Sequence, residues 1–178
     1  MTRTILTTAA LVLSAGLASP ALSAQAFVWD GNATPPPQMI DLATAQKAVD
    51  AAEASAIAIT GDPNGRVAIA VLDANGDVVV VRRMDTAIPR AVTSAMGHAR
   101  AALLFGVSAI DLYDAMNAGE SITAFPTKLP MGNWEISIEP GGIPIVKDGV
   151  TIGAIGVGGI PSLDDEKVAQ DAVDALGF

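Results

Sequence analysis

The hydrophobic pattern is clearest in the last third of the chain, where two apolar runs flank a short polar pair. The runs cover residues 143–146 and 150–157, and Asp148-Gly149 lies between them. Asp-Gly is typical of a two-residue type I′ turn, because both central residues of that turn need positive φ. The pattern predicts an antiparallel hairpin. Ser162 and Asp165 follow with the spacing of a capping box and predict that a helix begins there.

This last predicted helix is amphipathic, since apolar residues recur three and four apart and most polar residues lie between them. The inner face comprises Val168, Ala169, Ala172, Val173 and Leu176, and the outer positions are Asp164, Glu166, Lys167, Gln170, Asp171 and Asp174. We expect the inner face to pack on the sheet.

Earlier in the chain, an amphipathic pattern from Asp41 predicts a helix that Asp41 or Thr44 caps and that ends before Gly61. Residues 67–72 and 78–82 are rich in β-branched side chains around Asn75-Gly76, which predicts a second hairpin with the same turn chemistry. Both runs are almost continuously apolar. They therefore favour a sheet that is covered on both faces.

The middle of the chain predicts two helices. The first has Pro89 in its first turn and runs to about Phe105, and its side chains are small enough for another backbone to approach closely. Ser108 and Asp111 resemble a capping box and open a shorter helix through Met116. Residues 119–142 look irregular apart from a possible strand at 134–138, and a connection of this length is typical of a binding loop.

Together these elements predict one α+β domain over residues 41–178. It contains an antiparallel sheet of about five strands, built from two hairpins plus a lone strand, with helices on both faces.

The first 40 residues have a different character. Arg3, the apolar stretch 5–17 and the small residues around Ala24 and Ala26 follow the order of a signal peptide, which we expect to cover residues 1–26. Residues 27–40 contain Pro35-Pro36-Pro37 and predict an extended N-terminal arm. The mature protein is therefore expected to be periplasmic or secreted, without membrane insertion after cleavage. The chain has no cysteine, so its fold must rest on its core.

The charge balance restricts the classes of partner. Loss of Arg3 with the signal peptide lowers the basic count from 10 to 9 against 19 acidic residues, which gives a net charge of −10. Nucleic acids and anionic membrane surfaces attract basic proteins, so neither is expected as a partner.

Several segments of the chain resemble the GlcG/HbpS-like haem-binding family, and they occur in the same order as in that family. Relatives of this family form the C-terminal part of some corrinoid adenosyltransferases. The matching segments are residues 68–76, 83–85, 99–106, 141–145, 153–157 and 164–166. The resemblance implies an α+β subunit in a symmetric homo-oligomer, often an octamer, that binds or helps to dispose of haem outside the cytoplasm. Two positions depart from the family pattern: His98 stands where a lysine is expected, and Gly158 where a serine is usual.

His98 is the only histidine, so it cannot form a multi-histidine metal site, but one imidazole suffices as an axial ligand of haem iron. A helical wheel places it at the boundary of the buried face, where a partly exposed or interface histidine without a ligand role is the plainer interpretation. Weaker candidate iron ligands are Met84, Met96, Met131 and Tyr113. Arg82, Arg83 and Arg90 could pair with the haem propionates or simply face water or a partner subunit.

The candidate cofactor-binding residues are therefore His98, Arg83, Met84 and Arg90, with His98 as the candidate haem-iron ligand. The first hypothesis for function is an exported, oligomeric haem-binding protein for haem sequestration, sensing or disposal. The second is a small-molecule lyase or isomerase with a subunit-interface pocket lined by residues 119–142, Arg83 and His98. The third is a partner-binding module that holds no ligand.

Overall fold

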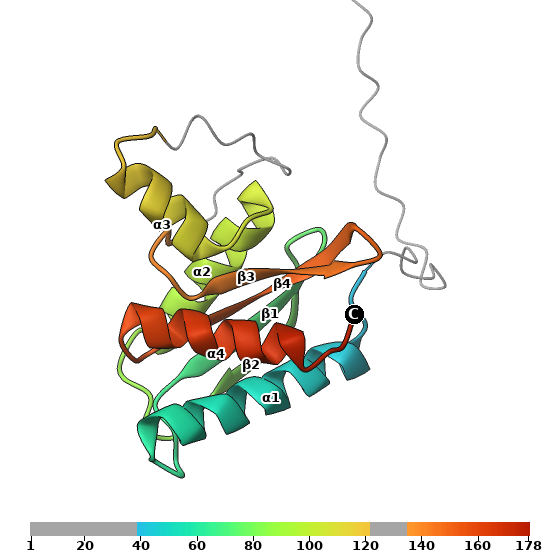
Figure 1. Ribbon diagram of the computed structural model, residues 1–178. Helices are drawn as coiled ribbons and strands as arrows, with labels where there is room; N and C mark the ends of the chain where they lie inside the picture. Colours follow the sequence, from blue (N-terminus) through green and yellow to red (C-terminus); the bar gives the residue numbers. More distant parts are fainter. Residues whose placement is uncertain (1–38, 122–134) are drawn as a thin grey trace, which may run out of the picture. The chain divides into compact units, whose positions relative to one another are not determined.

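The computed structural model describes residues 39–121 and 135–178, so the expected signal peptide and residues 27–38 of the arm lie outside the described residues. The described part is an α+β domain of four helices and four strands (Figure 1). In chain order the elements are α1 (Leu42–Thr60), β1 (Ala68–Asp73), β2 (Val78–Arg83), α2 (Ala91–Phe105), α3 (Ala109–Asn117), β3 (Gly142–Lys147), β4 (Val150–Gly158) and α4 (Ser162–Asp174).

The sheet joins the two predicted hairpins in the order β2-β1-β4-β3, and every neighbouring pair is antiparallel. The central strands β1 and β4 are buried along most of their length. The edge strand β2 is less covered than its apolar sequence predicted, since Val78 and Val81 are 53% and 41% exposed. A strand at the edge has a neighbour on one side only, so fewer side chains cover it.

The fifth strand predicted at residues 134–138 is wrong for its described part, because residues 135–138 form no strand. The Ser137 amide donates instead to the Gly97 carbonyl of α2, over 3.0 Å. A Cβ at Gly97 would lie 3.1 Å from Ser137 Cβ, so glycine lets this segment cross close to the helix. The Ser137 amide is therefore directed to a helix and not to a neighbouring strand.

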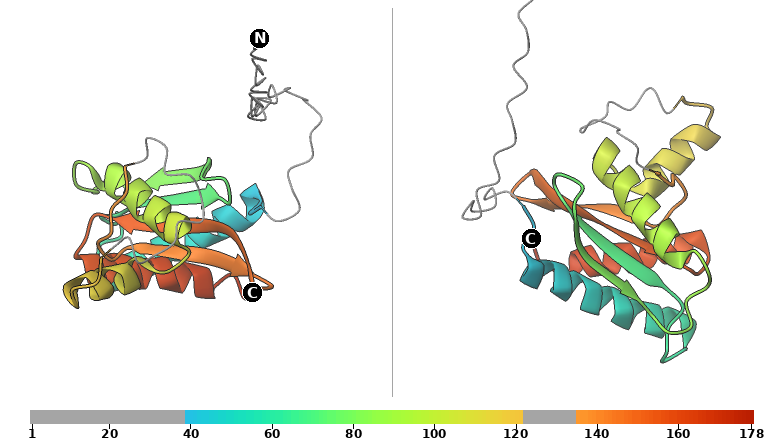
Figure 2. Two further views of the ribbon diagram at one scale, coloured as in Figure 1. Left: turned by 90° about the horizontal axis from the view of Figure 1, so that it is seen from above. Right: turned by 180° about the vertical axis from the view of Figure 1, so that it is seen from behind.

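Helices cover both faces of the sheet, as the sequence predicted. α1 and α4 lie side by side on one face, and α2 crosses the other (Figures 1 and 2). Alternate residues of β1 divide between the faces: Ile69 and Val71 join the core under α1 and α4, whereas Ala70 joins the core under α2. The larger branched side chains thus lie mainly on the two-helix side.

The face under α2 is lined by small residues, which lets this helix lie unusually close to β4. A Cβ added at Gly156 would overlap the Ala95 carbonyl oxygen, and one at Gly158 would lie 2.7 Å from Ser94 Cβ. Close packing therefore explains the glycine at position 158, where the family usually has serine. The sequence predicted that another backbone could approach this helix closely, and that backbone is β4 of the same chain.

The two hairpin turns differ, although the sequence predicted the same turn for both. Asp148 and Gly149 have φ of 51° and 76°, which confirms the type I′ turn between β3 and β4. In the first hairpin only Gly76 has positive φ, at 88°, and Asn75 does not. The Asp73 carboxylate accepts from the amides of Asn75 and Asp77, so a longer side-chain-supported turn replaces the predicted one.

The helix caps confirm two sequence predictions and correct a third. Asp41 accepts from the Thr44 amide at 2.7 Å, and Ser108 accepts from the Asp111 amide at 3.2 Å. Ser162 is not a cap: it is the first residue of α4, and Pro161 occupies the cap position without a side-chain hydrogen bond. No helix within the described residues is long and apolar enough to cross a membrane.

Candidate functional site

A cavity of about 660 Å³ lies where α2 begins, next to residues 135–139 and the turn that leads into α4. Its lining residues are Ile88, Pro89, Arg90, Ala91, Thr93, Ser94, Gly97, His98, Glu135, Ile136, Ser137, Glu139, Gly159, Ile160, Ser162 and Asp165. Three buried side chains in the described residues are polar or charged, namely His98, Asp165 and Glu166. Two of these three line this cavity, which makes it the candidate site.

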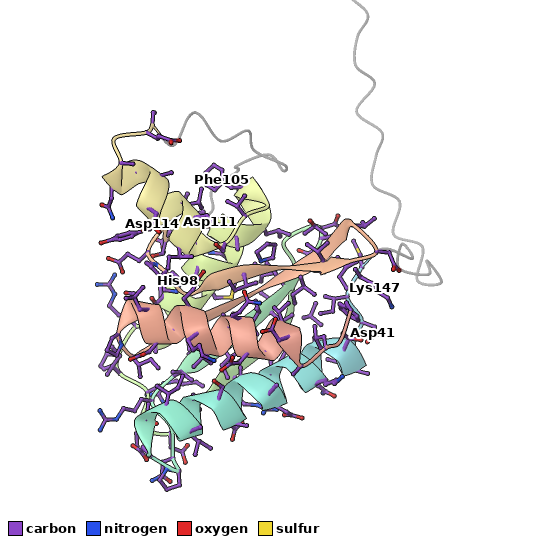
Figure 3. All side chains as sticks on the ribbon, viewed as in Figure 1. Asp41, His98, Phe105, Asp111, Asp114 and Lys147 are labelled. Atoms are coloured by element: carbon purple, nitrogen blue, oxygen red, sulfur yellow. The ribbon has the colours of Figure 1, made fainter. Side chains whose placement is uncertain are left out.

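His98 lies on α2, towards the end of the sheet at which α4 begins (Figure 3), and is only 1% exposed. Its Nδ1 is 2.6 Å from the Val157 carbonyl oxygen of β4. The helical wheel placed His98 at a boundary, but α2 is covered on more than one side. A Cβ at Gly141 or Gly142 would overlap His98, so this chain segment packs directly against the residue.

The protonation state of His98 follows from these contacts. Burial lowers the pKa of its imidazole, while the Val157 carbonyl and the charge of Glu139 act in the opposite direction. The neutral ring is therefore favoured. Because a carbonyl oxygen can only accept, Nδ1 carries the proton and Nε2 keeps its lone pair. Nε2 is buried and has no hydrogen-bond partner among the described residues.

Asp165 is the second buried polar residue of the cavity, at 2% exposed. Its Oδ1 accepts a hydrogen bond of 3.3 Å from the Ile160 amide. Burial raises the pKa of this carboxyl to about 7, against the lowering effect of the amides of Ile160 and Gly159, and the nearby charge of Asp164 raises it further. Asp165 is thus a carboxyl group that holds its proton up to near-neutral pH.

Glu166 does not line the cavity but fixes the chain beside it. Its carboxylate accepts from the amides of Gly141 at 2.5 Å, Gly142 at 3.1 Å and Ile110 at 3.3 Å. Burial raises the pKa of Glu166, and these three amides oppose that effect. The outward position predicted for Glu166 is therefore wrong: the residue turns inward because the loop before β3 presents amides that need an acceptor.

The four predicted cofactor-binding residues are not all brought together. His98 and Arg90 line the cavity. Arg83 and Met84 do not: the Arg83 guanidinium donates to the carbonyls of Met84 and Ala87, and Met84 is buried in the core under α1. The Arg83 side chain therefore stabilises the turn after β2, and the Met84 side chain is part of the apolar core.

The weaker candidates that the structure describes also lie outside the cavity lining. Arg82 forms ion pairs of 2.7 Å with both Asp50 and Glu53 of α1. Met96 packs in the core under α2, and Tyr113 on α3 is 41% exposed. Met131 lies outside the described residues.

A spacing signal for Asp165 was present in the sequence. It precedes Val168, Ala169 and Ala172 by three, four and seven residues, so it shares their buried helix face. Its spacing from Ser162 predicted a capping-box residue, and the sequence held no sign of a cavity beside it. Within residues 39–121 and 135–178, no three His, Asp or Glu side chains gather closely enough to hold a metal ion.

Relatives of known sequence cover much of this chain. A protein described as an uncharacterised 15.0 kDa protein in the dhaT-dhaS intergenic region of Citrobacter freundii is 32% identical over 138 residues, which are 77% of this chain and 92% of that protein. Protein GlcG of Escherichia coli strain K12 is 36% identical over 94 residues, which are 53% of this chain and 65% of GlcG.

The fold is also shared with solved structures. The crystal structure of a double mutant of Streptomyces reticuli HbpS matches with a TM-score of 0.65 and 28% identity, over 85% of this chain and 95% of HbpS. Residues 40–174 match the family described as "Haem degrading protein HbpS-like". That match spans all four helices and all four strands. The chain therefore belongs to the HbpS-like family of haem-degrading proteins.

Proposed function

We propose that this protein binds haem in the cavity at the start of α2, with Nε2 of His98 as an axial ligand of the iron. The observation that carries the proposal is the unpartnered Nε2 of a buried, neutral histidine that lines the cavity. The description of the family as haem-degrading supports haem as the ligand.

The residues present fit this group. A cavity of about 660 Å³ lies within the roughly 300–1,000 Å³ that is usual for small-molecule sites. Metal-ligating histidines commonly donate their second N–H to a backbone carbonyl, which fixes the ring and directs the free lone pair to the metal. The contact between His98 Nδ1 and the Val157 carbonyl is of this kind.

His98 would hold the iron and Val157 would hold His98 in the required tautomer, while the bound haem would supply the redox chemistry with oxygen. Because Nε2 is buried, its exposure requires movement of a neighbouring segment. Four residues of the segment 135–139 line the cavity, and the segment is joined to α2 by the hydrogen bond from the Ser137 amide to the Gly97 carbonyl. We propose that this segment is displaced when the ligand enters.

Export and self-association complete the proposal. The signal-like residues 1–26 support export to the periplasm or the medium. Exposed apolar side chains on β2, including Val78 and Val81, support assembly into a homo-oligomer such as an octamer.

The two other hypotheses have less support. The lyase or isomerase pocket required Arg83, whose guanidinium is bound by its own turn and does not line the cavity. A partner-binding module without a ligand required pockets too small for a cofactor, and the cavity is not small.

The test is a hemin titration of the mature protein, followed by absorption, with the variants His98→Ala and Met84→Leu beside the wild type. We expect a one-to-one Soret band in the wild type, a weakened or shifted band in His98→Ala, and an unchanged band in Met84→Leu. The Met84 variant is the matched control, because Met84 is a buried candidate ligand that lies outside the cavity.

Each other result has a definite meaning once circular dichroism has shown that the variants fold. An identical band in wild type and His98→Ala would reject His98 as the ligand and leave haem binding intact. A wild-type protein that gives no Soret band at any hemin concentration would reject the haem proposal for this chain.

A further inference from the structure

The starts of two long helices meet at one end of the cavity. Arg90 and Ala91 begin α2, while Ile160 and Ser162 lead into α4, and all four line the cavity. The end of β4, which leads into α4, touches the start of α2 directly, since a Cβ at Gly158 would lie 3.0 Å from the Ala91 carbonyl oxygen. The two helix starts are thus neighbours.

Neither helix start is capped by a side chain. Arg90 occupies the cap position of α2 with φ of 74°, and Pro161 occupies that of α4; neither makes a side-chain cap hydrogen bond. The first turn of a helix presents free backbone N–H groups and a partial positive charge, which together favour an anion. The first turn of α2 contains no acidic residue that could serve as that anion.

Two buried polar side chains, His98 and Asp165, line the cavity beside these helix starts. His98, one of its lining residues, has an unpartnered Nε2 and is 1% exposed. Asp165 belongs to the first turn of α4 and is also buried. The unpartnered Nε2 of His98 is an independent sign of a ligand in this cavity, because buried polar atoms in proteins normally have a hydrogen-bond partner.

We infer that this end of the cavity is a carboxylate-binding subsite, in which Arg90 and Asp165 both donate hydrogen bonds to a carboxylate of the ligand. The inference rests on the proposed haem function and adds the orientation of the ligand. Ala91, which follows Arg90, and His98 are seven residues apart on α2, which corresponds to about 10 Å along the helix axis. The carboxylate-bearing edge of the ligand then lies at the helix starts, and its centre lies towards His98.

The charges around the subsite set the pH range in which it binds a carboxylate. Below a pH of about 7 the Asp165 carboxyl keeps its proton and can donate an O–H···O⁻ hydrogen bond, which is among the stronger kinds. Above that pH its negative charge faces the ligand carboxylate. Glu135 and Glu139 line the cavity but are exposed on the far segment, and Asp164 precedes Asp165. Arg90 is the one basic residue among the lining residues.

The experiment compares porphyrins that have free or esterified propionates. Hemin, hemin dimethyl ester, protoporphyrin IX and its dimethyl ester are titrated into the mature protein at pH 6 and pH 8.5 in the same dilute detergent. Binding is followed by absorption and by quenching of tryptophan fluorescence. The variants are Arg90→Ala and Asp165→Asn, and the control is Arg83→Ala, an exposed arginine outside the cavity.

We expect the free acids to bind at least about tenfold more tightly than the esters at pH 6, the difference that one charge-assisted hydrogen bond typically provides. Arg90→Ala should remove most of this preference without weakening ester binding, while Arg83→Ala should keep it. At pH 8.5 the preference of the wild type should fall. Asp165→Asn keeps an N–H donor but cannot ionise, so its preference should stay the same at both pH values.

The possible failures can be told apart. Equal binding of acid and ester by the wild type would overturn the subsite and leave haem binding standing. An acid preference shown by metal-free porphyrin without an iron-dependent Soret shift would support the subsite and reject ligation by His98. If none of the four porphyrins binds, the subsite and the proposed function both fail. The wild-type comparison needs no variant, so it decides the matter even if a variant does not fold.

Discussion

Glu166 of α4 accepts a hydrogen bond from the Gly141 amide at 2.5 Å and thereby joins the last helix to the chain that enters β3. Gly141 in turn accepts from the Val157 amide at 2.8 Å, and Val157 holds His98 through its carbonyl. A single chain of hydrogen bonds therefore runs from α4 through the sheet to α2. It ties together the three elements α4, β4 and α2 beside the cavity.

The first prediction concerns the carboxylate that begins this chain. Glu166→Ala should lower the free energy of unfolding by about 2–4 kcal/mol, because the buried amides of Gly141 and Gly142 lose their acceptor. Urea denaturation measures the change. Asp174→Ala, on the exposed side of the same helix, is the control and should stay within about 0.5 kcal/mol of wild type. Equal effects of both substitutions would contradict a special role for Glu166.

The second prediction concerns the pH dependence of stability at Asp165. Its pKa is about 7 in the folded state against 3.8 in the reference state, so between these values the folded protein holds a proton that the unfolded chain has released. Stability contributed by Asp165 is therefore present below pH 3.8 and is lost as the pH rises towards 7. The loss amounts to at most about 4 kcal/mol.

Asp165→Asn tests this dependence, because asparagine has a similar shape and no charge. The variant should gain stability relative to wild type as the pH rises from 4 to 7, with a constant difference above pH 7. His98 acts in the opposite direction in both proteins: its lowered pKa costs stability as the pH falls below 6.5. The difference between the two unfolding curves isolates Asp165. Parallel curves across this range would show that its carboxyl is already ionised when folded.

The third prediction concerns the contact between β4 and α2. Gly156→Ala should destabilise the fold by about 3 kcal/mol, since the new methyl group would overlap the Ala95 carbonyl and lie 2.5 Å from the Ala99 amide nitrogen. Thermal unfolding measures the loss. Gly177→Ala is the control, because nothing lies within 4 Å of its added Cβ and only its φ of 74° costs about 1 kcal/mol. A loss at Gly156 no larger than at Gly177 would show that α2 can move away.

The fourth prediction concerns the tautomer of His98. Because this is the single histidine of the chain, NMR of untagged protein labelled with ¹⁵N should show one imidazole, with the proton on Nδ1. Its pKa should lie below 6.5, since burial disfavours the charged ring. An imidazole that titrates at 6.5 or above, or that carries its proton on Nε2, would remove the basis for ligation by this residue.

Local patterns in the sequence determined most of the elements of the fold. The Asp148-Gly149 turn, the caps at Asp41 and Ser108, and the small side chains of α2 depend on neighbouring residues or on helical spacing, and the structure confirms each of them. The family could also be predicted from the sequence, because its characteristic segments occur in order along the chain.

Tertiary structure alone decided that His98 and Glu166 are buried and that His98 and Asp165 share a cavity. His98, Asp165 and Glu166 come from two helices about 70 residues apart, and no local pattern records that the loop before β3 packs between them. A helical wheel assumes one buried face, whereas α2 is covered by the sheet and by residues 135–142. Burial of a polar group costs free energy unless a partner from elsewhere in the chain accepts or donates a hydrogen bond, so its position depends on the complete fold.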